Sequence, residues 1–511
     1  MFTALLAFWL VTALELLLAL FPSSAFRRYL ALFGVLLAVV SSIWLLAFGI
    51  SIFTVLLLVF GIYRSVNLLR LAKARIHQKY LRRSSLKTAF WIGITQVLAT
   101  LAWLSDVHWG LAGLRLWIFI AWADVVLALV LLASTSRHLW TTRTPRLAAT
   151  DVNDAKLPTL TVAIPARNET DDLDACLTSL VASSYPKLEI LVLDDCSQNK
   201  HTPEIIRSFA HAGVRFLQGK VPDINWLAKN AAYQQLYEEA NGELLLFCGV
   251  DVRFQPNSLR ELVAALQHKR KSMIALIPQN VVPGALTSLE TTLLQPMRYA
   301  WEISLPRRLF RRPPVLSTCW LIRRDVVASA GGFAAVSRSI VPESYFARVS
   351  AVQDGYSFMQ SSAKMGVTSM KSRVEQRATA VRTEYPRVHR RIELVMVLSL
   401  LELGGVVLPY ILTVTGFLHK ELTSIWLPSV IAVALLTITY IAVVALTYRA
   451  WLARALIQLP LAVAIDVFLL NYSMIRYEFF SVIWKDRNVC IPVMRVTDRL
   501  PEPELQRSAL S

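Results

Sequence analysis

Long apolar stretches with few charged residues lie on both sides of the middle of this chain, and shorter apolar runs lie between them. In the amino-terminal part the stretches are long enough for membrane helices, and the uncharged run within 28–64 is most simply two short helices. The other amino-terminal stretches are 2–21, 88–104 and 114–133. The pattern predicts a transmembrane region of about five helices over residues 1–136.

The apolar pattern returns after residue 391, with candidate spans at 394–417, 426–446 and 456–474. We therefore expect a second transmembrane region of about three helices over 391–482, followed by a polar tail at 483–511. Asp466 stands inside the last span. A carboxylate there is costly, and either faces the interior of the bundle or a lipid pathway, or pairs two neighbouring helices.

The middle of the chain has the short apolar runs of buried parallel strands at 160–164, 188–193 and 243–248. Between the first two, residues 171–184 have helical spacing, which makes a strand, helix, strand unit. Open sheets of this kind bind ligands at the carboxyl ends of their strands. Polar residues follow each strand at that edge, so the pattern predicts an α/β domain with a mostly parallel sheet and a site at its edge.

Composition places this domain at a membrane. Apolar residues make up 55% of the 511 residues and the mean hydropathy is +0.48, which indicates an integral membrane protein. The net charge of +18 is concentrated beside the apolar stretches, so anionic lipid headgroups rather than nucleic acid are the expected counterions. Five cysteines without C-x-x-C spacing suggest neither a zinc site nor disulfides, which fits a reducing compartment.

Basic residues predict the orientation through the positive-inside rule. The linker 137–157 is basic, and a segment read as one short loop is more so: Arg64, Arg70, Lys73, Arg75, Lys79, Arg82, Arg83 and Lys87. Both are expected on the cytoplasmic side of a plasma membrane, together with the middle domain. Three carboxyl-terminal spans would leave the basic tail outside, so one of those segments is expected to be interfacial or re-entrant.

Four motifs carry a resemblance to a known family. They are V-A-I-P-A-R-N-E at 162–169, L-D-D-C-S at 193–197, N-W-L-A-K-N-A-A at 225–232 and L-L-L-F-C-G-V-D-V-R-F at 244–254. In this order they resemble the family 2 glycosyltransferases of the GT-A fold, over about 158–390. The resemblance implies a GT-A domain inserted between the two transmembrane regions, and the flanking spans resemble the branch that glycosylates lipids.

The resemblance also implies where a nucleotide-sugar donor would bind. Pro165, Arg167 and Glu169 would line the nucleoside pocket, and Asp195, with Asp194, would hydrogen-bond the base. Glu169 or Asp194 could instead cap the following helix. Two basic residues, Lys229 and Arg382, would approach the donor diphosphate, although a lone lysine is commonly a solvated side chain.

Asp251 occupies the place of the second aspartate in the family's D-x-D motif, the expected ligand of Mg2+ or Mn2+. Gly249 stands where the first aspartate is usual, so a bound cation would lose one partner, and reduced or absent activity is compatible with this change. Asp251 could also be an ordinary turn residue after a strand.

Glu343 falls where the family has its catalytic carboxylate, after the Gly331-Gly332-Phe333 turn. An inverting transfer needs one general base to take the proton of the acceptor hydroxyl. A glutamate in the first turn of a helix is also simply stabilised by the helix dipole.

The resemblance implies an enzyme that transfers a single sugar to a lipid acceptor in the bilayer, because the Q-x-x-R-W string of processive synthases does not occur. Two alternatives remain: a processive polysaccharide synthase, and a catalytically inactive binding or scaffold subunit.

Overall fold

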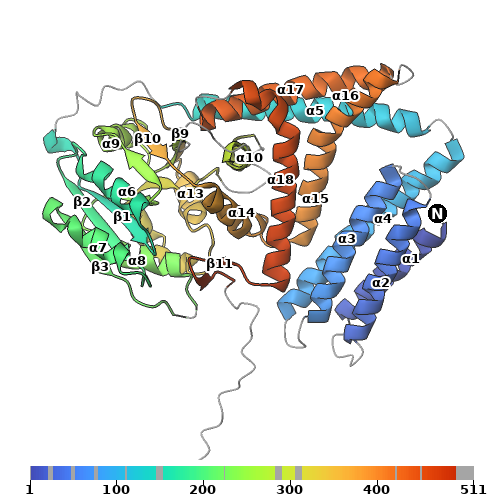
Figure 1. The fold of residues 1–511 in the computed structure, drawn as a ribbon, viewed down its shortest axis with the longest axis horizontal. Helices are drawn as coiled ribbons and strands as arrows, with labels where there is room; N and C mark the ends of the chain where they lie inside the picture. The colour runs from blue at the N-terminus through green and yellow to red at the C-terminus, as the bar shows by residue number, and fades with distance from the viewer. Residues whose placement is uncertain are drawn as a thin grey trace, which may run out of the picture.

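The computed structural model describes residues 2–20, 27–47, 52–73, 79–109, 112–144, 154–223, 225–281, 291–304, 313–419, 423–448 and 452–490. Within these ranges a sheet domain lies beside two groups of long helices (Figure 1). The tail beyond residue 490 and residues 145–153 of the linker 137–157 lie outside the described residues.

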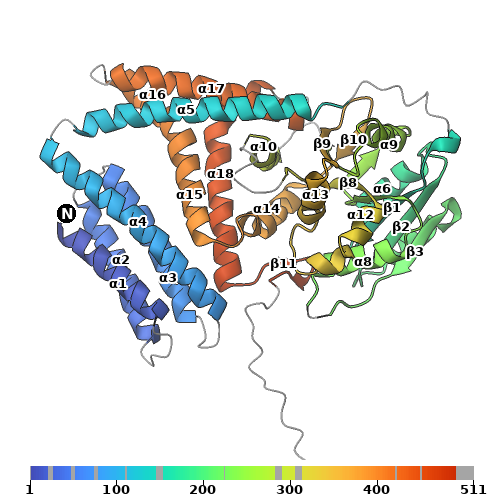
Figure 2. The same ribbon diagram turned by 180° about the vertical axis from the view of Figure 1, so that it is seen from behind.

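Five helices precede the sheet in the described part of the chain. They are α1 (Phe2–Leu20), α2 (Arg27–Leu46), α3 (Ile52–Lys73), α4 (Lys79–Trp109) and α5 (Ala112–Thr141). Helices α1 to α4 stand together as one bundle, whereas α5 runs across the molecule toward the sheet domain (Figures 1 and 2).

One expectation for this region was wrong. Seven of the eight basic residues expected in one loop belong to helices: Arg64, Arg70 and Lys73 to α3, and Lys79, Arg82, Arg83 and Lys87 to α4. Arg64 and Arg70 are also buried. Arg64 Nη1 lies 2.5 Å from Glu15 Oε2, and Arg70 Nε lies 2.9 Å from Glu478 Oε2. Acidic partners on other helices neutralise these two charges, so they act as helix-pairing groups and say nothing about orientation.

The sheet domain is built on a seven-stranded sheet with the order β3-β2-β1-β4-β8-β6-β9. Its strands are β1 (Leu160–Ala166), β2 (Leu188–Asp194), β3 (Val214–Gln218), β4 (Leu244–Cys248), β6 (Met273–Ile277), β8 (Cys319–Arg323) and β9 (Tyr356–Gln360). Only β8 runs antiparallel to its neighbours. The mostly parallel GT-A-like sheet predicted from the sequence is therefore confirmed.

A smaller sheet continues the edge where the site is expected. It contains β5 (Val252–Phe254), β10 (Val367–Ser369) and β7 (Gln279–Asn280). Strand β10 pairs antiparallel with β5, which brings Ser369 opposite Val252. Because the two strands are antiparallel, this pairing brings Lys371, which follows β10, close to Asp251, which precedes β5.

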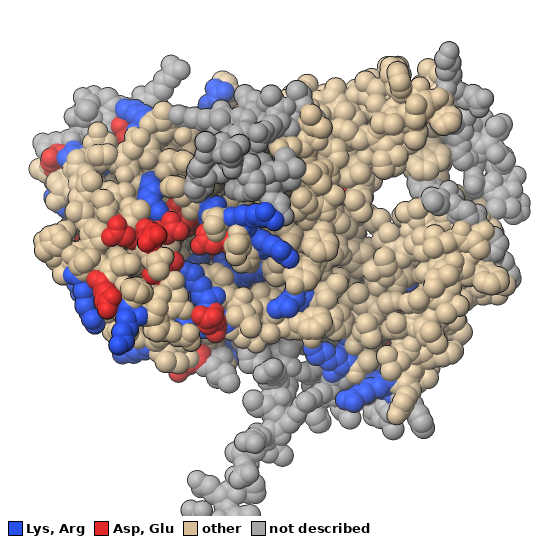
Figure 3. All heavy atoms as spheres, in the orientation of Figure 1, with Lys and Arg blue, Asp and Glu red and all other residues tan. Residues whose placement is uncertain are grey.

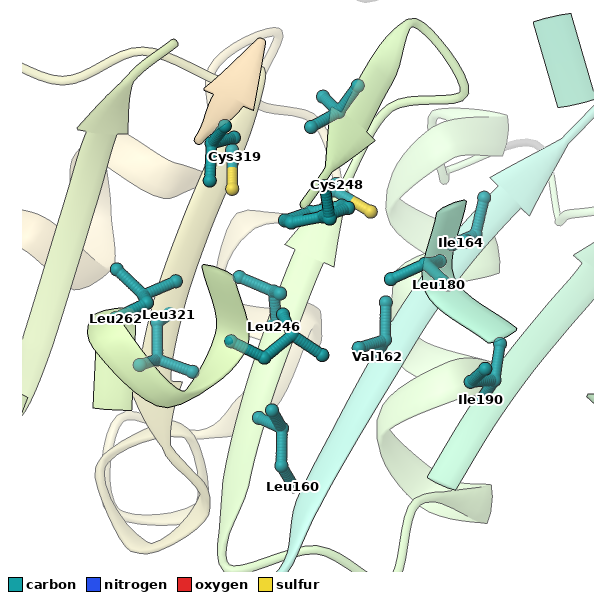
Figure 4. Close-up of a cluster of buried hydrophobic side chains, with 14 of the residues drawn as sticks. Leu160, Val162, Ile164, Leu180, Ile190, Leu246, Cys248, Leu262, Cys319 and Leu321 are labelled. Carbon is teal, nitrogen blue, oxygen red and sulfur yellow. The ribbon is translucent and has the colours of Figure 1, made fainter. Parts of the chain in front are cut away.

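Helices cover both faces of the large sheet. One face packs on α6 (Asp171–Val181), α7 (His201–Ser208) and α9 (Ser258–His268), and the other on α8 (Ala228–Glu239), α12 (Arg324–Ser329) and α13 (Glu343–Val352). On the first face, alternate residues of β1 and β4 point together toward Leu180 and Leu262 (Figure 4). This period of two is the pattern expected of a sheet with an apolar layer on each side.

The second face is centred on aromatic side chains. Trp320 of β8 is fully buried and stacks on Phe247 of β4, with ring centroids 4.4 Å apart. Tyr233, Phe333 and Phe346 close around this pair. The cluster joins β4, β8, α8 and α13, and so holds together the elements that carry the candidate site.

Two boundaries differ from the sequence prediction. Strand β1 continues through Pro165 to Ala166, because its pairing with β4 ends at Ala163 and the proline stands where that side of the strand has no partner. Helix α6 ends at Val181 rather than at Ser184, whose backbone N–H donates to Pro256 O instead.

The remaining helices link the sheet domain to the apolar region. They are α10 (Thr291–Ile303), α14 (Arg373–Arg387), α15 (Ile392–Glu402), α16 (Leu408–Leu418), α17 (Thr423–Thr447) and α18 (Leu452–Phe479). Helix α14 packs along α18: Ser473 Oγ donates to Val381 O at 2.6 Å, and Tyr477 Oη donates to Arg382 O at 2.7 Å. Asp466 accepts a 2.7 Å hydrogen bond from Trp301 Nε1 and so pairs α18 with α10.

The apolar run expected as one span at 394–417 is broken. A π-helical segment, Leu403–Val407, separates α15 from α16, and the two helices point in different directions (Figure 1). Gly404 and Gly405 lie in this segment, and glycine stabilises a helix less than other residues do. Pro409 follows the segment and has no backbone N–H to donate to the helix. Both features favour a change of helix geometry at this place. Helices α5, α16 and α17 lie across the ends of α15 and α18 (Figures 1 and 2).

In the described part of the chain, six helical segments are long and apolar enough to cross a membrane: 27–46, 53–73, 116–141, 392–418, 423–447 and 457–479. On the side of the molecule drawn in Figure 3, charged side chains gather on the surface of the sheet domain. The surface formed by the long helices carries few of them. This distribution is that of a membrane protein with a water-exposed domain.

Candidate functional site

Two adjoining cavities lie at the carboxyl edge of β1, β2 and β4, where the sequence predicted a site. Each has a volume of about 270 Å³. Five residues line both: Arg167, Asp195, Lys229, Arg382 and Trp484. We call the two cavities together the edge groove.

The sequence-predicted donor residues all lie at or next to the edge groove. Pro165, Glu169 and Asp251 line one of its cavities. Asp194 lies behind the groove, where its Oδ1 accepts the backbone N–H of Ser197 at 3.1 Å. That contact stabilises the turn after β2; it is not the helix cap left open for Asp194 in the sequence, because the following helix begins only at His201.

Arg167 uses most of its donors on backbone oxygens. Its Nη1 donates to Asp195 O at 2.7 Å and to Cys196 O, and its Nε donates to Lys485 O at 2.8 Å. These bonds hold the loop after β2 against the groove. Cys196 has a φ of +54°, a left-handed conformation that such external bonds stabilise.

A carboxyl-terminal hairpin reaches into the nucleoside end of the edge groove. It consists of β11 (Ile483–Trp484) and β12 (Arg487–Asn488) and follows the end of α18. Arg487 Nη1 lies 2.7 Å from both carboxylate oxygens of Asp195, and Lys485 forms an ion pair with Glu169. Both acids predicted to bind the nucleoside are therefore paired with this hairpin.

Burial changes the ionisation of these groups. The pKa of Asp195 is raised by burial, and Arg487 counteracts part of that rise. Burial also lowers the pKa of Lys485 to about 8. Sequence reasoning assigned Lys485 and Arg487 only to membrane orientation, because nothing in the chain order shows that they return to β2.

Basic side chains line the part of the groove where a diphosphate is expected. Lys229 lies 5.0 Å above the Tyr233 ring, and Arg382 lies 4.4 Å above the Trp484 ring. Burial lowers the pKa of Lys229 to about 8 and the pKa of Arg382 to about 10. Cations held in a partly dry pocket gain from an anionic ligand that replaces the lost water.

Asp251 is held by the segment after β10. The residue is 8% exposed, its Oδ2 accepts a 2.7 Å hydrogen bond from Ser369 Oγ, and Lys371 Nζ lies 3.7 Å from the same oxygen. A side chain at Gly249 would place its Cβ 2.4 Å from Asp251 Oδ1. The glycine therefore leaves the space that the Asp251 carboxylate occupies.

The groove does not fit the expected divalent cation. Among the described residues, no group of three or more His, Cys, Asp or Glu side chains could hold a metal ion. Asp251 is a single carboxylate, and one of its oxygens already has a hydroxyl and an ammonium group beside it. Mg2+ and Mn2+ need several oxygen ligands, and a neighbouring cation repels them.

Glu343, the predicted base, begins α13 directly after Pro342. It is 1% exposed and does not line either cavity, and its Oε2 has no hydrogen-bond partner among the described residues. Its negative charge acts on Lys229, Arg382 and Arg298, so it lies behind the cationic wall of the groove. An unpaired buried carboxylate oxygen is available to accept a proton.

Comparison with known proteins agrees with the motifs. Residues 161–330 match the model of the family described as Glycosyl transferase family 2. The probable glycosyltransferase YdaM of Bacillus subtilis is 26% identical over 187 residues, which are 35% of this chain and 44% of YdaM. The glycosyltransferase AglE of Haloferax volcanii is 25% identical over 183 residues, which are 35% of this chain and 56% of AglE. The match thus spans about half the length of each relative.

Solved structures show weaker similarity. The mannosyltransferase PcManGT of Pyrobaculum calidifontis, in complex with GDP-Man and Mn2+, superposes with a TM-score of 0.39 at 15% identity, over 69% of this chain and 99% of that one. TarS of S. aureus gives a TM-score of 0.31 at 16% identity, over 44% of this chain and 40% of that one. The family match and the two relatives identify residues 161–330 as a glycosyltransferase family 2 domain, which confirms the resemblance carried by the four motifs.

Proposed function

We propose that this protein transfers one sugar from a nucleotide-sugar donor to a lipid acceptor at the cytoplasmic face of the plasma membrane. The observation that carries the proposal is the position of the edge groove. Cations line it, the unpaired Oε2 of Glu343 lies behind it, and α14, which carries Arg382, packs on the apolar helix α18. A site that holds an anionic soluble donor beside a bilayer suits a lipid acceptor.

The acceptor side of the proposal rests on α10. Its Trp301 lines an apolar cavity of about 110 Å³ between the long helices, and its Arg298 lies close enough to Glu343 for their charges to interact. Helix α10 therefore contributes one side chain to this cavity and another to the surroundings of the candidate base. The cavity is lined mainly by aliphatic side chains from α5, α10, α17 and α18: Leu131, Met297, Leu436, Val443, Leu459 and Val463.

In this proposal the chemical step is an inverting displacement. Glu343 is buried in this structure, so the step requires the site to open around it; Glu343 then takes the proton of the acceptor hydroxyl while that oxygen forms a bond to the anomeric carbon of the sugar. The bond between this carbon and the diphosphate oxygen breaks, and the nucleoside diphosphate leaves with the electron pair. Lys229 and Arg382 stabilise the negative charge on the leaving group.

The Mg2+ or Mn2+ expected from the D-x-D resemblance is not included in this proposal. Asp251 would be its one carboxylate ligand, and Lys371 stands beside that carboxylate at 3.7 Å. The step described above needs only positive charge at the diphosphate, which the lysine and arginine side chains provide.

Glu343→Gln tests the proposal. Purified protein in lipid nanodiscs would be supplied with UDP- and GDP-sugars and extracted lipids, and nucleotide release would be followed with and without divalent ions. We expect a loss of turnover of about 100-fold or more, with nucleotide binding retained because Glu343 does not line the groove. Glu239→Gln, which changes an exposed side chain at the end of α8, is the matched control.

An unchanged rate in Glu343→Gln would reject the assignment of the base. The product distinguishes the other activities: mass spectrometry of the lipid fraction shows one added sugar for the proposed transfer and a ladder for a processive synthase. Failure of every donor to bind would leave a binding or scaffold subunit as the remaining alternative.

A further inference from the structure

We propose that Lys371 takes the place of the divalent cation in this protein, by binding the diphosphate of the donor directly. The inference rests on the proposed function and names the group that holds the leaving diphosphate. It is carried by how the segment Ser369–Lys371 is attached to Asp251.

Three contacts fix that segment. The backbone N–H of Met370 donates to Asp251 O at 2.8 Å, Ser369 Oγ donates to Asp251 Oδ2 at 2.7 Å, and Lys371 Nζ stands 3.7 Å from Oδ2. The first two contacts fix the backbone of the segment beside Asp251, and the mostly buried side chain of Lys371 lies against the carboxylate. Asp251 thereby positions an ammonium group at the place where the resemblance predicts a metal ion.

A metal ion and Lys371 would compete for the same space. Mg2+ binds carboxylate oxygens at about 2.1 Å, so an ion on Asp251 Oδ2 would lie within about 6 Å of Lys371 Nζ. Two cations so close in a partly buried pocket repel each other strongly. The lysine would therefore weaken the binding of an ion at Asp251.

The groove also offers cations for a diphosphate without a metal. Several of its charged residues are already occupied: Lys485 pairs with Glu169, Arg487 pairs with Asp195, Arg167 binds backbone oxygens, and Glu375 caps α14 through Ser372. Among the described residues that line the groove, Lys229 and Arg382 form no ion pair, and Lys371 shares Asp251 with Ser369.

Lys371 is suited to an anionic ligand. Burial lowers the pKa of Lys371, and the charge of Asp251 opposes that effect. A diphosphate would add a second anionic partner and stabilise the charged form further. Lys371 Nζ and Asp251 Oδ2 are close enough for an ion pair but, at 3.7 Å, too far apart for a hydrogen bond. The ammonium group therefore keeps its N–H donors for phosphate oxygens.

Binding measured without metal tests the inference. Protein in nanodiscs would be titrated with UDP, GDP and their hexose esters by calorimetry, once in EDTA and once in Mg2+ or Mn2+. We expect the affinity to change by less than about threefold between the two conditions. We expect Lys371→Met to weaken binding about 10- to 100-fold in both, and Lys371→Arg to retain most of it.

Two further variants make the result specific. Lys364→Met removes an exposed lysine that pairs with Glu261 outside the groove, and should bind as the unmodified protein does. Asp251→Asn separates the two mechanisms: a metal site would lose its carboxylate and its affinity, whereas a lysine site keeps or gains affinity. Thermal unfolding of each variant verifies that it is folded.

Binding that appears only with Mn2+ or Mg2+, and that Asp251→Asn abolishes while Lys371→Met does not, would overturn the inference and leave the proposed function standing. No binding of any nucleotide under either condition would overturn both.

Discussion

Release of the carboxyl-terminal hairpin is expected to limit donor binding. Arg487 donates to both carboxylate oxygens of Asp195 at 2.7 Å and to Asp195 O at 3.1 Å. If Asp195 binds the nucleoside base, as proposed, the donor has to take the place of this guanidinium. Arg487→Met should then strengthen nucleotide binding, because the competing partner is gone.

The size of the effect follows from the geometry. Hydrogen bonds to a charged group contribute about 1.5–3 kcal/mol. The side chain of Arg487 is 20% exposed and that of Asp195 is 8% exposed, so solvent screening favours the lower end of that range. Since a difference of about 1.4 kcal/mol corresponds to a tenfold change in the dissociation constant, the lower end of this range means that Arg487→Met should bind nucleotide about tenfold more tightly.

Calorimetric titration with UDP and GDP measures this change. Arg323→Met is the matched control, because Arg323 forms an ion pair with Asp325 on the exposed surface of the same domain. Burial raises the pKa of Asp195, and in Arg487→Met the arginine no longer opposes that rise. Asp195 should therefore be protonated at acidic pH in the variant, and the gain in nucleotide affinity should disappear there. Weaker or unchanged affinity in Arg487→Met would refute the competition and show that the arginine contacts the donor or is irrelevant to it.

Two other predictions concern the groove and the core. The pKa of Lys229 is lowered to about 8 in the free protein, and a bound diphosphate should raise it because it favours the charged lysine. The contribution of Lys229 to nucleotide affinity should therefore be constant below pH about 8 and fall by up to tenfold per pH unit above it. Titrations from neutral to alkaline pH would show this fall, and Lys229→Met should remove the part due to this lysine; an identical profile in the variant would contradict the assignment. Trp320→Ala should destabilise the sheet domain by about 3–5 kcal/mol, because a fully buried ring is lost from the aromatic cluster. A marked drop in melting temperature is expected, whereas Val352→Ala, at an exposed helix end, should leave it unchanged.

The sheet and its edge were predictable because local patterns determine them. Apolar runs followed at once by polar residues gave the positions of β1, β2 and β4, and a parallel sheet necessarily gathers the ends of these strands. Asp195 and Asp251 were found in this way. Their roles in binding stay predictions.

Partners from distant parts of the chain were not predictable. Arg487 is 292 residues from Asp195 in sequence, and no periodicity connects them. Lys371 lies near Asp251 only because β10 pairs with β5. Arg64 appeared to belong to a basic loop, since the sequence does not show that Glu15 of another helix neutralises it. Each of these side chains is defined by tertiary packing and carries no local signal.

Helix α18 contacts both the apolar helices and the helix and hairpin that border the edge groove. At mid-length its Asp466 holds α10, further along Ser473 and Tyr477 hold α14, and past its end the chain enters the hairpin on Asp195. A single helix is thus attached both to α10 beside the apolar cavity and to α14 and the hairpin at the groove. If α18 spans the bilayer, a change of bilayer thickness that tilts it would also shift the hairpin on Asp195, and under the proposed function the lipid thickness would then affect donor binding.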